Sequence, residues 1–225
     1  MEKVMKPIAF SPNLVDQVYD AVLDAICNGS LAPGEPVVQE QIAETLDVSR
    51  QPVVQALVLL KKQGFVEPAG RKGHRVAPLD AELARRVYSI RGALDRLAAR
   101  EAAGNPAAAS LLSAALEKGR ALVASGSVAD LIEADAAFHQ TIYSLADNPL
   151  IAQTSDVHWR HIKRVMGAVL RDGAQRESVW SEHAKIAEAI AEGDAKRAGK
   201  LAEKHVTQAA EYLVAQLEQD LAISA

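Results

Sequence analysis

The chain has few of the residues that mark secreted, membrane-spanning or base-stacking proteins. Its 225 residues include one cysteine, Cys27, which excludes an internal disulfide and fits a reducing compartment. Aromatic residues make up only 4% of the chain, so stacking on bases is not the main mode of any nucleic-acid binding. No apolar run approaches the roughly 18 residues of a membrane span, and the N-terminus lacks the apolar core of a signal peptide. We therefore expect a cytoplasmic protein with no membrane partner.

Positive charge is scarce in the whole chain but concentrated in one segment. The formal net charge is −4, whereas residues 50–75 carry six cations against the single acid Glu67. These cations are Arg50, Lys61, Lys62, Arg71, Lys72 and Arg75. A charged run is often only a solvated surface, so this segment becomes informative through the fold predicted for it.

Residues 39–76 have the pattern of a winged helix-turn-helix. The first short helix would turn three residues inward, namely Ile42, Ala43 and Leu46. A tight turn over residues 47–49 follows. Ser49 suits the N-cap of the second helix, and Pro52 falls in its first turn, where a missing backbone N–H costs nothing.

The second helix of this motif is predicted to read DNA. Its buried stripe would consist of Val53, Ala56, Leu57 and Leu60. The helix should stop at Gly64, and its outer face remains free to enter a major groove. On that face we expect Arg50, Gln51 and Gln55 to contact DNA.

A helix before the motif and a β-hairpin after it complete the first domain. The helix should begin near Pro12 and bury residues at four-residue spacing, which are Leu14, Val18, Val22 and Ile26. Residues 65–67 and 74–77 can pair as the strands of a wing. Glycines flank its tip and allow a close approach to phosphate or to a minor groove. The predicted wing contacts are Arg71, Lys72, Gly73 and His74.

The chain changes character after Pro78. We place a DNA-binding domain in residues 1–78 and a second domain in residues 79–225. Breakers in the second domain, such as Gly104-Asn105-Pro106 and Gly193-Asp194, divide it into about six helices. The expected fold is therefore mostly α, a winged helix-turn-helix followed by an all-α antiparallel helical bundle.

Four polar residues interrupt the apolar faces of this bundle: Asp135, His139, His183 and His205. Asp135 and His139 lie one turn apart on one helix. His183 lies ten residues before Gly193 and His205 twelve after it, so both are roughly 15–18 Å from that turn at about 1.5 Å per residue. One oxygen and three imidazoles would then converge, a set suited to Zn²⁺ or another divalent transition metal.

Less specific interpretations remain open for these polar residues. Buried histidines can simply be hydrogen-bonded within the core. Arg91 lies on an apolar face and needs an anion. Asp95, one turn later, could be that anion, or Arg91 could hold the carboxylate of a ligand next to the metal.

The residues together resemble a GntR-type transcription regulator of the FadR subfamily with a C-terminal FCD domain. In the first domain the resemblance rests on residues 29–34, Leu46-Asp47-Val48-Ser49-Arg50, Pro52-Val53 and Gly64-Phe65-Val66. In the second it rests on Arg91, Asp135, His139, Asn148-Pro149-Leu150, His183, Gly193-Asp194 and His205.

The resemblance implies a homodimer that binds palindromic operator DNA and responds to a small carboxylate effector. It also implies a metal held by the aspartate and three histidines, with Zn²⁺ first, and Ni²⁺ or Mn²⁺ as alternatives. Matching to the family adds Arg160 and Asp172 as effector contacts beside Arg91. The family's recognition helix usually carries an arginine where this chain has Val54, so Arg50, Gln51 and Gln55 must carry more of the readout.

The leading hypothesis is a ligand-responsive transcriptional regulator, expected to be a repressor and not an enzyme. One alternative is a metal-dependent enzyme built on the bundle, although no general base is evident beside the metal. Another is a metal-sensing regulator with no organic effector.

Overall fold

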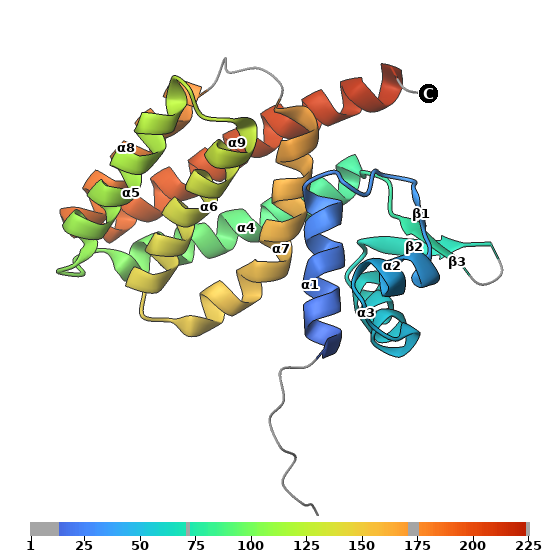
Figure 1. The fold of residues 1–225 in the computed structure, drawn as a ribbon. Coiled ribbons are helices and arrows are strands. Elements are labelled where there is room, and N and C mark those ends of the chain that lie inside the picture. The colour runs from blue at the N-terminus through green and yellow to red at the C-terminus, as the bar shows by residue number, and fades with distance from the viewer. Residues whose placement is uncertain (1–13, 71–72, 171–175, 224–225) are drawn as a thin grey trace, which may run out of the picture. The chain divides into compact units, whose positions relative to one another are not determined.

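A computed structural model describes residues 14–70, 73–170 and 176–223. The chain divides into two compact units, Met1–Pro78 and Leu79–Ala225, and each is described by itself (Figure 1). Among the described residues, no helix has the length and apolar character needed to cross a membrane.

The N-terminal unit is a winged helix-turn-helix. Its elements are α1 (Leu14–Cys27), β1 (Pro36–Val37), α2 (Gln39–Thr45), α3 (Arg50–Lys62), β2 (Val66–Ala69) and β3 (Gly73–Val76). The turn between α2 and α3 includes Asp47 with φ of 50°, a conformation that aspartate tolerates better than most residues. Ser49 occupies the N-cap of α3 as predicted, but its side chain makes no capping hydrogen bond.

Apolar faces of α1 and α3 form most of the core of this unit. The predicted stripe of α3 is buried in full: Val53, Ala56, Leu57 and Leu60. In α1, Val18, Val22 and Ile26 are buried as expected, whereas Leu14 is exposed because it is the first residue of the helix and lies beyond the core.

The wing contains a strand that the sequence pattern did not indicate. The sheet is antiparallel in the order β1-β3-β2, and β1 pairs Pro36 with Arg75 and Val37 with His74. Two residues that include a proline carry no detectable period of two, so β1 is defined only by its partner.

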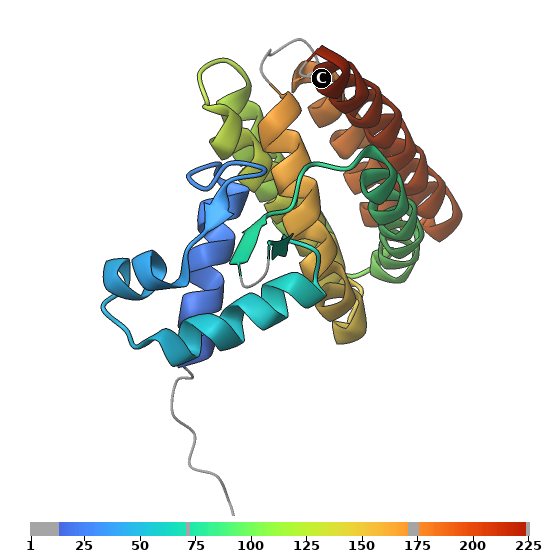
Figure 2. The same cartoon turned by 90° about the vertical axis from the view of Figure 1, so that its right-hand side faces the viewer.

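The C-terminal unit is a bundle of helices. They are α4 (Ala81–Ala102), α5 (Ala108–Val123), α6 (Val128–Leu145), α7 (Pro149–Val169), α8 (Arg176–Ala191) and α9 (Ala195–Ile223). Figure 2 shows α4 running alongside α9, and these two helices share the most extensive helix pairing in the unit. The mostly α fold predicted from the sequence is confirmed.

Local sequence explains where the bundle helices begin and end. The Asp80 side chain caps α4 by accepting from the backbone N–H groups of Glu82 and Leu83. Ser127 and Asp130 form a capping box at the start of α6. Gly104 and Gly193 both have positive φ, and a Cβ on either would lie within 4 Å of the other glycine. The turn between α4 and α5 therefore packs against the turn between α8 and α9.

Candidate metal centre and DNA-contact surface

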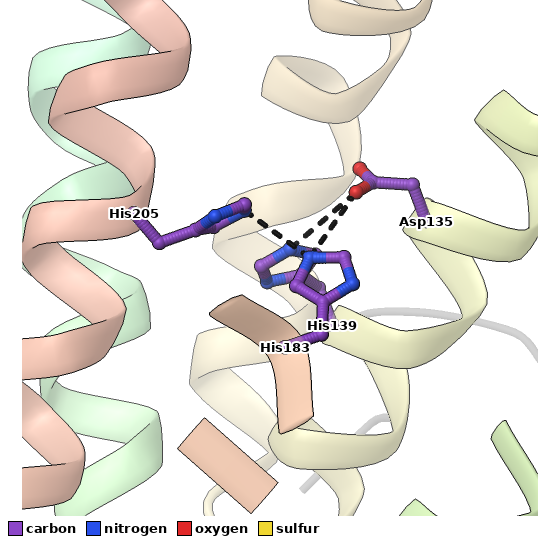
Figure 3. Close-up of side chains that lie close together, drawn as sticks. All are labelled: Asp135, His139, His183 and His205. Carbon is purple, nitrogen blue, oxygen red and sulfur yellow. Dashed lines mark hydrogen bonds and ion pairs between the residues drawn. The ribbon is translucent and has the colours of Figure 1, made fainter. Parts of the chain in front are cut away.

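Four side chains from three helices converge inside the C-terminal unit. Asp135 and His139 come from α6, His183 from α8 and His205 from α9 (Figure 3). Each is at most 6% exposed, and one ligand atom from each lies within 4.8 Å of the others. The side chains predicted from spacing to meet are therefore brought together in this structure.

The distances in this cluster fit a small cation. The Nε2 atoms of His183 and His205 are 3.2 Å apart, and the same atom of His183 is 3.3 Å from Asp135 Oδ1. Nitrogen ligands about 2.0–2.1 Å from a tetrahedral Zn²⁺ are about 3.3 Å from one another. His139 Nε2 lies 3.9 Å from Asp135 Oδ1, so it also faces the same point.

A buried carboxylate orients His139. Asp95 on α4 lies 3.0 Å from His139 Nδ1, which leaves Nε2 directed to the cluster. The Tyr143 hydroxyl donates to the other oxygen of Asp95, and Trp159 Nε1 donates to the Tyr143 oxygen at 3.2 Å. Such outer carboxylate–histidine pairs fix the tautomer of a ligating imidazole.

His205 is oriented in the same way from α8. Glu182 Oε2 lies 2.7 Å from His205 Nδ1, so Nε2 of His205 faces the cluster. This hydrogen bond also lowers the pKa of Glu182, which keeps the carboxylate ionised. For His183, by contrast, Nδ1 is buried and has no hydrogen-bond partner among the described residues.

Aromatic side chains enclose the cluster on its inner side. Phe138 stacks on His183 with ring centroids 4.2 Å apart, and Trp180 meets His183 edge-on at 4.8 Å. A Cβ on Gly119 would lie 1.9 Å from the Trp180 ring, so this glycine leaves the space that Trp180 occupies. These two rings cover the inner side of His183.

Burial controls the protonation of the centre. It lowers the pKa of His139 and lowers that of His183 further below its ordinary value, with the nearby Arg91 acting in the same direction. Burial would raise the pKa of Asp95, but its interactions with His139 and Arg91 prevail and lower it to about 2. His139 and His183 are therefore neutral near pH 7, the form in which imidazole binds a metal.

Arg91 lies beside the centre and is 4% exposed. Its Nε is 3.3 Å from Asp95 Oδ2, its Nη2 is 3.8 Å from Asp135 Oδ2, and its guanidinium lies 4.1 Å over the Trp159 ring. Neither Nε nor Nη2 makes a hydrogen bond to any residue that the structure describes. The predicted pairing with Asp95 exists, yet it leaves donors of Arg91 available.

A cavity of about 430 Å³ opens onto this centre. Asp135, His205 and Arg91 contribute to its lining, and so do Tyr88 and Glu182. Its remaining wall is mostly apolar, with Val128, Leu131, Ile132, Met166, Leu170 and Leu213, and it also includes the polar residues Ser178, Gln208, Glu211 and Tyr212. A concave, mostly apolar site with a few polar groups is typical of small-molecule binding.

The other two predicted effector contacts differ in their placement. Arg160 pairs with Asp156 at 3.2 Å on the half-exposed side of α7 and does not line the cavity, so its position gives no support for that role. Asp172 lies outside the described residues.

The exposed face of α3 presents the predicted DNA contacts. Arg50, Gln51 and Gln55 are all exposed. Two apolar residues lie on the same face, with Val54 41% and Val58 59% exposed. These valines are one helical turn apart, so they form an apolar strip beside the two glutamines.

Two cations of this surface are held in ion pairs. Arg50 Nη2 is 2.6 Å from Glu40 Oε1 of α2, and both side chains are more than half exposed. On the wing, Arg75 Nη2 is 2.6 Å from Glu67 Oε1. A phosphate would have to replace or join these carboxylates.

The described part of the wing supports close approach at its tip. Gly73 is exposed, and a Cβ there would lie 2.9 Å from the Ala69 carbonyl oxygen, so glycine is required for the hairpin. His74 is half-buried in the central strand, with Nδ1 buried. Arg71 and Lys72 lie outside the described residues.

Sequence reasoning missed the outer residues of the centre. Glu182, Tyr143 and Trp159 were not singled out, because a polar residue beside a predicted ligand is unremarkable in a one-dimensional pattern. Asp95 was considered only as a partner for Arg91. The spacing of four between Asp95 and Arg91 was the one available signal.

Comparisons with known proteins identify the family of each unit. Residues 14–76 match the gntR family of bacterial regulatory proteins, and residues 86–208 match the FCD domain. The HTH-type transcriptional regulator YdhC of Bacillus subtilis is 25% identical over 90% of this chain and 92% of its own length. The HTH-type transcriptional repressor RspR of Escherichia coli is 26% identical over 85% of this chain and 83% of its own.

Solved structures share the fold. A GntR transcriptional regulator from Rhodococcus sp. RHA1 superposes with a TM-score of 0.75 at 22% identity, covering 89% of this chain and 97% of that protein. Escherichia coli McbR/YncC superposes with a TM-score of 0.78 at 20% identity, covering 93% and 100%.

Proposed function

This chain belongs to the gntR family of bacterial transcriptional regulators with an FCD domain, and we propose that it is a repressor released from its operator by a small carboxylate. The effector would bind in the cavity of the helical unit, beside a divalent metal held by Asp135, His139, His183 and His205. The family and its relatives are regulators, so the alternative of a metalloenzyme is set aside.

The convergence of four buried ligand atoms within 4.8 Å carries this proposal. Buried histidines that only serve packing would not need carboxylates on their far nitrogens, yet two of the three have them. The centre also opens onto a cavity, as a site that exchanges ligands must. A bound divalent ion would supply positive charge there, and Zn²⁺ suits the mixed nitrogen and oxygen donors.

The free donors of Arg91 support an effector that meets both the metal site and Arg91. Arg91 is fully enclosed by the helical unit and its Nε and Nη2 donors are not hydrogen-bonded within the described residues. A carboxylate in the cavity could accept from this planar group with charge-assisted hydrogen bonds. That interaction would weaken the ion pairs that Arg91 makes with Asp95 and Asp135.

On the DNA side, α3 would read the major groove with Arg50, Gln51 and Gln55. The wing would approach phosphate or a minor groove with Arg71, Lys72, Gly73 and His74. Glutamine can bond adenine bidentately, and apolar groups contact the methyl group of thymine. The apolar strip of Val54 and Val58 therefore suits an A·T-rich half-site. Val54 stands where the family usually has an arginine. At this position the chain would therefore make an apolar contact with a base instead of a charged contact with DNA.

An exposed apolar stripe supports a homodimer. Leu83, Ile90 and Leu97 recur every seven residues along α4, and each is at least 37% exposed in the single chain. A seven-residue apolar repeat suits helix pairing across a two-fold axis. Ile90→Glu should convert the dimer into a monomer in light scattering, whereas Ser89→Glu, at an exposed neighbouring position of α4, should not. A dimer unaffected by Ile90→Glu would place the interface elsewhere.

Regulation would follow from a shift between two arrangements of the dimer. An effector can change operator binding only by preferring one arrangement, so the contacts that differ must include Arg91 and the cavity wall. Because the centre joins α6, α8 and α9, and Asp95 and Arg91 belong to α4, effector binding could alter how α4 packs in the bundle.

Operator release is the direct test of this proposal. The metal content of the purified dimer would be measured first, and binding to a selected operator would then be titrated with carboxylic acids in metal-loaded and metal-free protein. Release by an acid only in the loaded protein is the expected result. Release by metal alone would favour the metal-sensing alternative, and no binding to any DNA sequence would overturn the operator role.

A further inference from the structure

We propose that Trp180 is a positioning residue for His183, and that Gly119 provides the space that keeps the Trp180 ring against this histidine. The inference rests on the proposed metal centre. It goes further by assigning a role to two residues outside the ligand set, Gly119 on α5 and Trp180 on α8.

His183 differs from the other two histidines of the centre in how its ring is held. Nδ1 of His139 lies 3.0 Å from Asp95, and Nδ1 of His205 lies 2.7 Å from Glu182. Nδ1 of His183 is buried and has no hydrogen-bond partner among the described residues. A hydrogen bond to the outer nitrogen usually fixes the orientation of a ligating imidazole. Within the described part of the chain, the ring of His183 must therefore be fixed by packing.

Two aromatic rings supply this packing. Phe138 lies nearly parallel to His183, with ring centroids 4.2 Å apart and planes 17° apart. Trp180 lies nearly perpendicular to His183, at 4.8 Å and 87°, and these are the two favoured arrangements of aromatic pairs. Phe138 and Trp180 also contact each other, with centroids 6.4 Å apart. The two rings restrict the imidazole in different directions, which keeps its Nε2 directed to Asp135 and His205.

The Trp180 ring can occupy this position because α5 carries a glycine opposite it. A Cβ on Gly119 would lie 1.9 Å from Cη2 of Trp180, and 2.1 and 2.2 Å from Cζ2 and Cζ3. These three atoms form the outer edge of the indole, and Trp180 is 3% exposed. Carbon atoms of separate side chains do not come so close, so a methyl group on residue 119 would displace the buried ring. His183 follows Trp180 by three residues on the same face of α8, so the displacement would change its packing.

The test measures metal binding by the full-length protein after chelation, with Co²⁺ as a spectroscopic probe and Zn²⁺ in competition with a chelating dye. Gly119→Ala should weaken the binding of both ions by at least about tenfold, within the range for residues that orient a ligand. It should also change the visible spectrum of Co²⁺, which reports the geometry of the ligands. Gly92→Ala is the matched control, since a Cβ there meets only Val206 Cγ1, at an ordinary 3.7 Å. Its affinity and spectrum should equal those of the unchanged protein.

A second change at residue 180 distinguishes positioning from general destabilisation. Trp180→Phe removes the part of the indole that the added methyl group would meet, and it keeps a ring beside His183. Combined with Gly119→Ala, it should restore most of the lost affinity and the Co²⁺ spectrum. Trp180→Leu also removes the clash but leaves no ring, so it should restore neither. Recovery to the same degree with Trp180→Leu would overturn the positioning role.

The single changes at residue 180 give the same answer without the added methyl group. Trp180→Leu should weaken Zn²⁺ binding about tenfold, near the upper value for one aromatic pair, whereas Trp180→Phe should keep most of the affinity. Equal affinities in these two variants, or an unchanged affinity and spectrum in Gly119→Ala, would overturn the inference and leave the metal centre standing. Failure of the unchanged protein to bind either ion would overturn the proposed centre itself.

Discussion

The two units of this chain place their functional polar groups in opposite environments. In the helical unit Asp135, His139 and His183 are buried, and outer residues orient the histidines that they contact. In the winged helix-turn-helix the corresponding groups are exposed, and Arg50 is held by an ion pair with Glu40. The buried centre is therefore preorganised and sensitive to single changes, whereas the exposed surface should respond in small, salt-dependent steps.

The largest effect should come from breaking the buried centre. His183→Ala removes a ligand that no neighbour can replace, so we expect metal affinity to fall by more than about 100-fold, beyond the range for outer residues. Operator binding by the effector-free protein should persist, because the change lies outside the DNA-contact surface. Elemental analysis and competition with a chelating dye would measure the loss. His158→Ala, on the half-exposed side of α7, is the control, and an unchanged metal content in His183→Ala would refute the ligand set.

A smaller effect is expected one contact away from the centre. Glu182→Gln keeps the size of the side chain but weakens its hold on His205 Nδ1, and should reduce metal affinity by about tenfold. Glu211→Gln provides a matched control, since Glu211 lines the same cavity and makes no described contact with a ligand histidine. Equal losses in the two variants would mean that cavity charge, rather than orientation of His205, sets the affinity.

The contrast between the units also explains what could be predicted from sequence. The helices of the bundle and the meeting of His183 with His205 followed from breakers and residue counts, since an α-helix has a constant rise. The outer contacts of Tyr143, Trp159 and Glu182 depend on helix rotation and rotamers, which a one-dimensional pattern does not contain. Strand β1 likewise depends on a distant partner, as β-pairing generally does.

On the exposed unit, Val54 offers a test of base reading. If it contacts a thymine methyl, replacing that thymine by deoxyuridine in a selected operator should weaken binding about fourfold, since one buried CH₂ is worth about 0.8 kcal/mol. Val54→Ala should be insensitive to the same replacement. Leu59→Ala, which trims another exposed apolar residue of α3, should retain the full sensitivity. Uracil-insensitive binding by the unchanged protein would exclude methyl recognition.

The smallest effect should arise where DNA competes with a surface ion pair. Glu40→Gln frees Arg50 for phosphate or base, so operator affinity should rise about twofold, in keeping with the small energies of exposed pairs. Glu44→Gln removes the same charge from an exposed position of α2 without freeing Arg50, and it isolates the general electrostatic contribution. Fluorescence anisotropy at one fixed salt concentration would compare the two variants, and the gain of Glu40→Gln beyond that of Glu44→Gln is the contribution of the freed Arg50. Equal gains in both variants would show that Glu40 opposes DNA only through its charge, and that Arg50 already reaches the duplex while paired.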